Sequence, residues 1–364
     1  MDRFAFIIHP LNPKADVARK YPGLARVLPI GLIHFLSRYW PPLVLSHVTG
    51  IRSESTGKEI EGWLLACPLT ARQLLRLPER VSYWKIIQTG RLAQRLRVDI
   101  LGLGAYTSVV GDGGVTVARA LEIPVTTGDS YTVALTVRAL LKAGAAVGVA
   151  PREATAAVVG ATGAIGSACA RLLATRVRRI ILEGRRMHRL HQVAGQVRRS
   201  GGAQVDVSAD INSIREAHLV ISATSAGQPI IEPEHLRPGA VVCDVAQPHD
   251  VSRTVVETRD DVLVVDGGIV ALPGDVDFGF DYGLPPGLTF GCMAETIALA
   301  LEGHFADYTL GKNLELERVQ RIERMADRHG LRLATFRSFG RALEDETIEA
   351  VRRRAGQAAG ADPV

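Results

Sequence analysis

Two short segments of this sequence contain residues whose types and spacing are suited to chemistry. The first, Val158 to Gly166, has glycines at three-residue intervals, and the second, Phe290 to Glu295, places Cys292 directly after a glycine. A glycine-rich turn of this kind binds the pyrophosphate of a dinucleotide, and a cysteine thiolate is a nucleophile. Together they suggest a redox cofactor that faces a sulfur nucleophile, a conclusion that neither segment supports alone.

The glycine-rich turn follows an apolar, strand-like run and opens a helical pattern, which is the context that dinucleotide binding requires. Glycine permits a tight turn, so that backbone amides at the helix N-terminus can approach a pyrophosphate. Thr224 and Gly268 follow two later strands, and strand ends in such a sheet face the cofactor. The candidate cofactor-binding residues of the turn are Gly160, Thr162, Gly163, Ala164, Ile165 and Gly166.

The second strand of this region ends at Glu183, Gly184, Arg185 and Arg186. A carboxylate at this point holds the ribose hydroxyls of NADH, whereas an arginine accommodates the 2′-phosphate of NADPH. Arg185 and Arg186 lie just beyond the strand tip, so both guanidinium groups can reach the ribose edge. We expect NADPH as the cofactor. NADH is the alternative, because the Glu183 carboxylate could hold its ribose hydroxyls.

Cys292 begins a helical pattern after a loop that ends at Gly291. The positive end of the helix macrodipole lowers the pKa of a thiol at this position and raises its thiolate fraction. An ordinary core position is the open alternative, because cysteine is often buried. Ser130 and Tyr131 are candidates for the opposite wall of a catalytic site, with helix capping as the alternative for Ser130. For His9 a structural role is the preferred interpretation.

The composition suits a compact protein of two domains with 364 residues. Its four cysteines show no paired spacing, which argues against a disulfide framework or a zinc site and indicates a reducing cytoplasm. We expect no signal peptide, no membrane span and no nucleic-acid module. Amphipathic segments before Pro41 leave peripheral lipid contact open, with a buried acyl tunnel as the other explanation.

Short apolar runs alternate with helix-length segments between residues 155 and 265, which predicts βαβ units around a parallel sheet. Strands near 98–103 and 124–126 and helices near 115–121 and 131–145 indicate a further α/β region before it. We therefore expect an α/β protein with four parts. These are an N-terminal α/β substrate domain (1–150), an NAD(P)-binding Rossmann domain with a doubly wound parallel sheet (151–290), C-terminal helices that carry the catalytic cysteine and pack back on the cleft (291–350), and a tail (351–364).

Four motifs occur in the same order in the long-chain fatty acyl-(acyl-carrier-protein) reductases, and the chain resembles that family from residue 1 to about residue 330. The resemblance implies a cytoplasmic enzyme that reduces a fatty acyl thioester to an aldehyde with NADPH, while Cys292 carries the acyl group. It also implies acyl carrier protein as the partner, with acyl-coenzyme A left open as the donor. The motifs are Ala157–Ser167, Gly102–Ser108, Thr126–Thr132 and Phe290–Glu295.

The chain also departs from that family, which keeps other functions open. Asp129 and Tyr131 stand where the family has asparagine and histidine, so we expect different polar contacts with the substrate. The Rossmann half also resembles glutamyl-tRNA reductases and shikimate dehydrogenases, and a shared fold does not determine the chemistry. One alternative is an NAD(P)-dependent dehydrogenase of an amino acid or a shikimate-like alcohol. It would need a Lys/Asp acid-base pair with a lysine in the N-terminal domain, but Lys58, Lys85 and Lys142 lie in no polar cluster of the sequence. The other is a cofactor-binding regulator without turnover.

Overall fold

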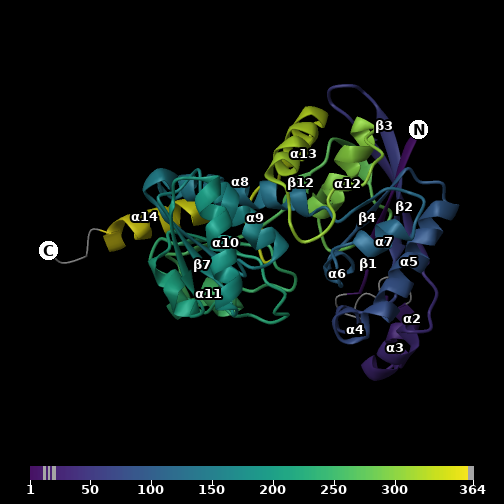
Figure 1. The fold of residues 1–364 in the computed structure, drawn as a ribbon, viewed down its shortest axis with the longest axis horizontal. Coiled ribbons are helices and arrows are strands. Elements are labelled where there is room, and N and C mark those ends of the chain that lie inside the picture. The colour runs from purple at the N-terminus through teal and green to yellow at the C-terminus, as the bar shows by residue number, and fades with distance from the viewer. Residues whose placement is uncertain (11–13, 15–16, 19–21, 360–364) are drawn as a thin grey trace. The chain divides into compact units, whose positions relative to one another are not determined.

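The computed structural model describes the chain except for residues 11–13, 15–16, 19–21 and 360–364, and Figure 1 shows the order of its elements. The chain divides into two compact units. Unit 1 comprises Met1–Tyr131 and Val270–Arg332, and unit 2 comprises Thr132–Ile269 and Leu333–Val364. Both are built from helices and sheets, so the expected α/β class is confirmed. Within the described part of the chain, no helix has the length and apolar character needed to cross a bilayer.

Unit 1 is built on a six-stranded mixed sheet with the order β13-β2-β3-β1-β4-β5. The central strands β3, β1, β4 and β5 are parallel, whereas β2 is antiparallel to both β3 and β13. Two strands at one edge are therefore added to a parallel core by antiparallel pairing. The strands are β1 Asp2–Ile8, β2 Leu43–Arg52, β3 Glu59–Ala66, β4 Ile100–Leu103, β5 Val125–Thr126 and β13 Gly274–Asp277.

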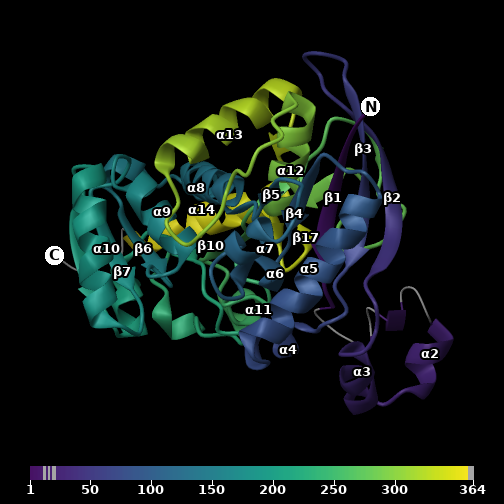
Figure 2. The same cartoon turned by 45° about the vertical axis from the view of Figure 1, so that its right-hand side comes forward.

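Alternate residues of β1 face opposite sides of this sheet, as the pleat requires. Ala5 and Ile7 join an apolar core with residues of α5 (Glu79–Arg95), while Phe6 lies on the other side, with Thr296 of α12 close to Gly102. Helix α12 (Gly291–Glu302) is buried from Met293 to Leu301, as expected for a helix that is apolar on every side. Figure 2 shows α12 beside β4 and β1, with α13 (Leu316–His329) packed against it.

Smaller helices complete unit 1. They are α2 Pro22–Val27, α3 Ile30–Ser37, α4 Ala71–Arg76, α6 Tyr106–Val109 and α7 Val115–Arg119.

Unit 2 contains a six-stranded, fully parallel sheet with the order β11-β10-β9-β6-β7-β8. Counted along the chain from β6, the spatial order is 6-5-4-1-2-3, which is the doubly wound Rossmann arrangement predicted from the apolar runs. Strand order reverses beside β6, the strand that leads into the glycine-rich turn. The strands are β6 Thr155–Val159, β7 Arg179–Glu183, β8 Gln204–Ser208, β9 Leu219–Ser222, β10 Val241–Asp244 and β11 Leu263–Asp266.

Helical segments cover both faces of this parallel sheet. Helix α8 (Asp129–Ala146) lies against one face, where Gly144 contacts Leu219 and the Cys243 thiol lies 3.7 Å from the Thr136 carbonyl oxygen. An apolar cluster that includes Val220, Val242 and Val255 fills the other face. The remaining elements are α9 Ala164–Leu173, α10 Met187–Ser200, α11 Arg253–Thr258, α14 Asp345–Ala359, η1 Pro151–Glu153, η2 Ile211–Glu216, η3 Pro233–His235, β12 Ile269–Ala271, β14 Leu288–Phe290, β15 Arg332–Leu333, β16 Arg337–Ser338 and β17 Arg341–Ala342.

The two units differ from the expected division of the chain. Residues 132–150, expected in the N-terminal domain, belong to unit 2 because α8 packs on its sheet. Residues 270–332 return to unit 1, so the cysteine helix α12 is an inner layer of that unit and not part of a separate C-terminal segment. Of the expected tail, residues 351–359 lie in α14, and 360–364 lie outside the described residues.

Candidate active site

Cys292 is the second residue of α12, and its thiol is half-buried. Backbone amides of Ala105, Cys292 and Met293 act on the sulfur and lower the pKa of the thiol by favouring the thiolate. Burial and the nearby Asp129 carboxyl outweigh these amides and raise the pKa of the thiol to about 12. We expected the helix terminus to lower this pKa. In the protein without bound ligands the net shift is upward, because desolvation of the sulfur is the larger effect.

A tight turn after β4 directs the Ala105 amide toward Cys292. Ala105 has a φ of 47°, a left-handed conformation that is uncommon for a residue with a side chain. The next residue, Tyr106, donates its backbone N–H to His9 Nε2 over 3.0 Å, and His9 Nδ1 lies 3.2 Å from the Pro10 carbonyl oxygen. Burial lowers the pKa of His9 to about 4, so the ring is neutral and both nitrogens are engaged. His9 thus has a structural role: it positions the turn.

Gly128 lies directly against the backbone of Cys292. Its φ is +77°, and a Cβ atom at this position would lie 2.2 Å from Cys292 Cα and 2.5 Å from Cys292 Cβ. No side chain fits in that space, and a side chain would also strain the backbone. The backbone around Gly128 is therefore in direct contact with the start of the cysteine helix.

Glu295 lies one turn after Cys292, is fully buried, and joins three segments of unit 1. Its carboxylate accepts hydrogen bonds from the Tyr131 amide over 2.8 Å, from Thr309 Oγ1 over 2.6 Å, and from Thr126 Oγ1. Burial raises the pKa of Glu295, whereas these donors favour its charged form. The carboxylate thus holds the segment around Gly128 in place against α12.

Ser130 and Tyr131, both predicted as catalytic, lie close to Glu295. Thr309 Oγ1 is 2.8 Å from Ser130 Oγ, and Ser130 lines a cavity of about 220 Å³ together with Tyr308 and Arg318. The Tyr131 side chain is fully buried. The structure therefore brings both residues next to the cysteine helix, with Ser130 bordering a cavity and the Tyr131 side chain buried.

Asp129 is a second carboxyl at this site, half-buried at the start of α8. Burial and the negative charge of Glu295 raise the pKa of Asp129 to about 7. Sequence reasoning noted Asp129 only as a departure from a family pattern and did not single out Glu295 or the Ala105 amide. The sequence did contain a signal for both carboxyls. Asp129 lies in the Thr126–Thr132 motif with Ser130 and Tyr131, and Glu295 lies in the Phe290–Glu295 motif with Cys292.

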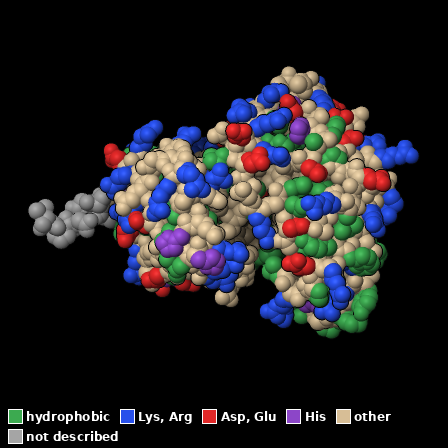
Figure 3. Space-filling view, in the orientation of Figure 1, with side chains coloured by type: hydrophobic (Ala, Val, Ile, Leu, Met, Phe, Trp, Pro, Cys, Tyr) green, Lys and Arg blue, Asp and Glu red, His purple; other side chains and the backbone are tan. Residues whose placement is uncertain are grey.

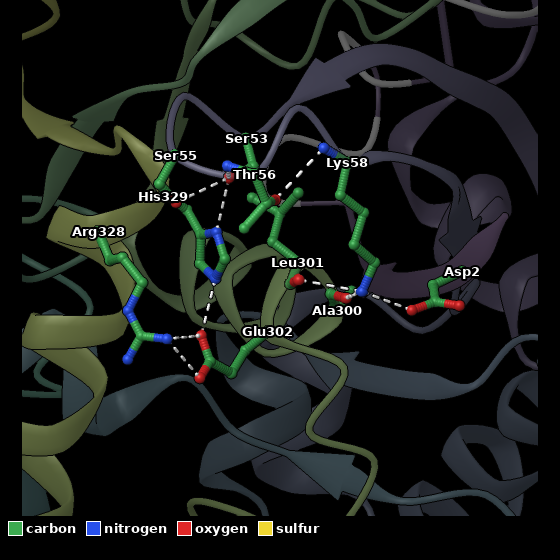
Figure 4. Close-up of polar contacts among 10 residues, drawn as sticks. All are labelled: Asp2, Ser53, Ser55, Thr56, Lys58, Ala300, Leu301, Glu302, Arg328 and His329. Atoms are coloured by element: carbon green, nitrogen blue, oxygen red, sulfur yellow. Dashed lines mark hydrogen bonds and ion pairs between the residues drawn. The ribbon is translucent and has the colours of Figure 1, made fainter.

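The far end of α12 is held by a polar network, shown in Figure 4. Lys58 Nζ donates to the carbonyl oxygens of Ala300 and Leu301 in the last helical turn over 2.9 and 3.0 Å, and the Ala300 carbonyl also accepts from the Gly303 N–H over 3.1 Å. His329, 2% exposed, bridges Ser53 Oγ and the Glu302 carboxylate over 2.8 and 2.9 Å. The helix that begins with the thiol is therefore fixed at its other end as well.

In unit 2, the glycine-rich turn follows the carboxyl end of β6. Gly160 has a φ of +79°, and a Cβ atom there would lie 2.7 Å from the Ala223 carbonyl oxygen. A Cβ atom on Gly166 would lie 2.5 Å from the Gly160 carbonyl oxygen, so α9 packs closely on the turn. Gly163 is the N-cap of α9, and the helix begins at Ala164, followed by Ile165. Together with Thr162, these residues surround the N-terminus of α9.

The other predicted cofactor-binding residues follow the carboxyl ends of neighbouring strands. Glu183 at the end of β7 is buried, which raises its pKa, and its carboxylate accepts a hydrogen bond from the Gly160 amide. Arg185 and Arg186 are exposed beyond it. Thr224 donates its N–H and its hydroxyl to Asp250 over 2.9 and 2.6 Å.

Gly268, the last of these residues, follows β11 and has a φ of +70°.

The fold and its strand-end residues are those of an NAD(P)-dependent dehydrogenase or reductase, and the family profile for shikimate/quinate 5-dehydrogenase matches residues 143–266. Two characterised relatives match most of the chain. The long-chain acyl-(acyl-carrier-protein) reductase of Synechococcus elongatus is 27% identical, over 80% of this chain and 87% of the relative. The aminotransferase PigE of a Serratia strain is 30% identical over 83% of this chain, which spans only 36% of PigE.

Two solved structures match the chain at low similarity. The 5-ketofructose reductase of a Gluconobacter strain has 13% identity and a TM-score of 0.38, over 89% of this chain and 99% of that one. Glutamyl-tRNA reductase from Methanopyrus kandleri has 14% identity and a TM-score of 0.28, over 78% of this chain and 55% of that one. The resemblance to the long-chain reductases, predicted from four motifs, is confirmed by the sequence match.

Proposed function

We propose that this protein reduces a fatty acyl thioester to a fatty aldehyde with NADPH, through an acyl group carried on Cys292. The observation that carries the proposal is a half-buried thiol at the start of α12 with three backbone amides directed at its sulfur. The match to a long-chain acyl-(acyl-carrier-protein) reductase over 80% of the chain supports it. Amides in this position stabilise first a thiolate and then the oxyanion of an attacked carbonyl.

The reaction begins when Cys292 transfers its proton to Asp129, whose pKa of about 7 suits a base near neutral pH. The thiolate attacks the acyl carbonyl carbon, the bond from that carbon to the donor sulfur breaks, and the donor leaves as a thiol with the proton returned by Asp129. An acyl thioester remains on Cys292. NADPH, when bound, supplies the hydride that reduces this thioester to a hemithioacetal. The amides of Ala105 and Met293 hold the developing oxyanion, and collapse of the hemithioacetal releases the aldehyde and restores the Cys292 thiol.

The glycine-rich turn fits a dinucleotide. A side chain at Gly160 or Gly166 would collide with the backbone, so glycine keeps the turn open at the N-terminus of α9, where a pyrophosphate binds. Glu183 is buried and engaged with the Gly160 amide, whereas Arg185 and Arg186 are exposed. We therefore assign NADPH in preference to NADH, with its 2′-phosphate held by the two arginines.

We propose acyl carrier protein as the acyl donor, with acyl-coenzyme A as the alternative. The chain has a net charge of +5 and a calculated pI of 9.2, which suits an acidic carrier. All four cysteines are free thiols, in keeping with the cytoplasmic location that we propose.

Aldehyde formation tests the proposed reaction. The protein is incubated with palmitoyl-acyl carrier protein and NADPH, and the aldehyde is quantified by gas chromatography. We expect Cys292→Ala to lower the rate on the order of a thousandfold, because no other group replaces the nucleophile. Cys67→Ala removes another thiol of unit 1 and serves as the matched control. A Cys292→Ala variant that retains the wild-type rate contradicts the proposal.

A shikimate-like or amino-acid dehydrogenase is the second candidate, because a dehydrogenase profile matches residues 143–266. The three lysines considered for such chemistry make structural contacts. Lys58 caps α12, Lys85 Nζ donates to the Trp40 carbonyl over 2.6 Å, and Lys142 Nζ lies 5.7 Å from the Phe336 ring centre. Reduction of NADP⁺ by shikimate without acylation of Cys292 would favour this candidate. Absence of both activities would favour a cofactor-binding regulator.

A further inference from the structure

Unit 1 exposes a group of large apolar side chains on and beside helix α3. Phe35 is 55% exposed, Ile30 is 52% exposed, and Tyr39 just beyond the helix is 72% exposed. Figure 3 shows hydrophobic side chains gathered at the lower right, where Figure 1 places α3. Single exposed apolar residues are ordinary, but a group of this kind marks an interaction surface. We call this surface the α3 face, which consists of Val27, Ile30, Leu32, Phe35, Tyr39, Leu75 and Trp84.

The polar contacts of α3 attach it to the rest of unit 1 and leave these apolar side chains outward. Ser37 Oγ donates to Gln73 Oε1 over 2.8 Å, and Gln73 Nε2 donates to the His34 carbonyl over 2.6 Å. Lys85 Nζ bonds the carbonyl of Trp40, just after the helix. A surface helix usually turns its apolar side inward. Here Ile33 is the only large apolar side chain of α3 that is buried among the described residues.

The charge around the α3 face is positive. The sequence has no Asp or Glu from Val17 to Ser53, whereas Arg26 and Arg38 are both exposed there. The adjoining segment from Ala71 to Trp84 contains Arg72, Arg76 and Arg80 against a single carboxylate, Glu79. Cations that border an apolar surface are complementary to a sheet of anionic headgroups.

We propose that the α3 face binds the surface of an anionic lipid bilayer. Ile30 and Phe35 enter the boundary between headgroups and acyl chains, as amphipathic interfacial helices do, and the arginines contact lipid phosphates. Tyr39 and Trp84 have the apolar body and polar edge that suit this boundary. A second copy of this chain is a poorer occupant, because two such faces would oppose arginines with few carboxylates to pair them. The inference stands on the surface alone and does not depend on the reductase reaction.

Vesicle flotation of the full chain tests this inference. We expect the protein to float with phosphatidylcholine vesicles that contain phosphatidylglycerol, and on the order of tenfold less with phosphatidylcholine alone. Ile30→Ser/Phe35→Ser and, separately, Arg26→Glu/Arg38→Glu should each reduce flotation on the order of tenfold. Met187→Ser/Val256→Ser and Arg352→Glu/Arg353→Glu make the same kinds of change at exposed positions of unit 2 and should float like the wild type.

Three results would overturn the inference. One is unchanged flotation of Ile30→Ser/Phe35→Ser with its circular dichroism spectrum intact. Another is equal flotation of the wild type with neutral and anionic vesicles. The third is a wild-type dimer in light scattering that this double variant converts to a monomer, which would identify a second copy as the occupant. If the protein does not float with vesicles but still forms aldehyde at the normal rate, the membrane inference is wrong and the proposed reaction is unaffected.

Discussion

Cys292 and Asp129 have pKa values that are shifted in the same direction and for a shared reason. Burial disfavours the thiolate and the carboxylate alike, and a neighbouring negative charge adds to each shift: that of Asp129 for Cys292, and that of Glu295 for Asp129. The protein alone therefore keeps Cys292 protonated near neutral pH. A thiolate forms only when another group accepts the proton, and Asp129 is a carboxyl whose charge acts on the thiol.

Replacing Asp129 separates its charge from its role as a base. Asp129→Asn removes a negative charge, so the pKa of Cys292 should fall and iodoacetamide should alkylate the thiol several-fold faster at pH 8. Aldehyde formation should nevertheless slow, because the proton acceptor is gone. Alkylation is followed by mass spectrometry of the Cys292 peptide. Asp275→Asn, an exposed carboxyl of unit 1, should change neither rate, and slower alkylation of Asp129→Asn would contradict the assignment.

The same shift makes stability depend on pH. The folded pKa of Asp129, about 7, lies above its ordinary value of 3.8, so the fold favours the neutral carboxyl. The contribution of Asp129 to folding stability is therefore fully present below the ordinary pKa of 3.8. It is lost as pH rises through the folded pKa of about 7. Asp129→Asn should therefore gain about 1–3 kcal/mol relative to the wild type between pH 4 and pH 8. A stability difference that stays constant in urea unfolding across this range would contradict the shift.

At the scale of secondary-structure elements, the start of α12 depends on its contact with Gly128. Gly128→Ala combines a strained φ with a Cβ atom 2.2 Å from Cys292 Cα. We expect it to cost about 3 kcal/mol or more of unfolding free energy and to abolish turnover. Gly287→Ala has a φ of +74° with nothing within 4 Å, so it measures the backbone strain alone, about 1 kcal/mol. Equal losses in the two variants would mean that the contact with Cys292 is unimportant.

The end of α12 depends on Lys58. Lys58→Met keeps the aliphatic stem but removes the donor for the Ala300 and Leu301 carbonyls, and should cost about 1–3 kcal/mol. Lys312→Met, at an exposed position of the same unit, should cost little. Thermal unfolding measures both. If the two variants melt at the same temperature, Lys58 does not stabilise the helix.

Elements with a strong local pattern could be predicted, and elements whose character depends on distant contacts could not. The inner strands β6, β9 and β10 are largely apolar and fully buried, because both faces of a parallel sheet are covered. Strand β2 has an irregular pattern of exposure and two register shifts against β3, so it has no clear sequence signal. Cys292 could be found from its place at a helix start. Burial of Glu295, by contrast, depends on Thr126, Tyr131 and Thr309, which are distant from it or from one another in sequence.

At the scale of the whole molecule, the proposed reaction draws on groups of both units. Unit 1 contains the thiol, its amides and its carboxyls, while unit 2 contains the glycine-rich turn and the exposed arginines. Acylation of Cys292 should therefore require only unit 1 chemistry, whereas release of the aldehyde requires the cofactor held by unit 2.

The most direct test of that account is the mass of the Cys292 peptide before and after NADPH is added. The protein is incubated with palmitoyl-acyl carrier protein alone, digested, and analysed by mass spectrometry. We predict a palmitoyl adduct on the Cys292 peptide that disappears when NADPH is added, with aldehyde formed in equal amount. Aldehyde formation without any adduct on Cys292, or an adduct on another cysteine, would contradict the account.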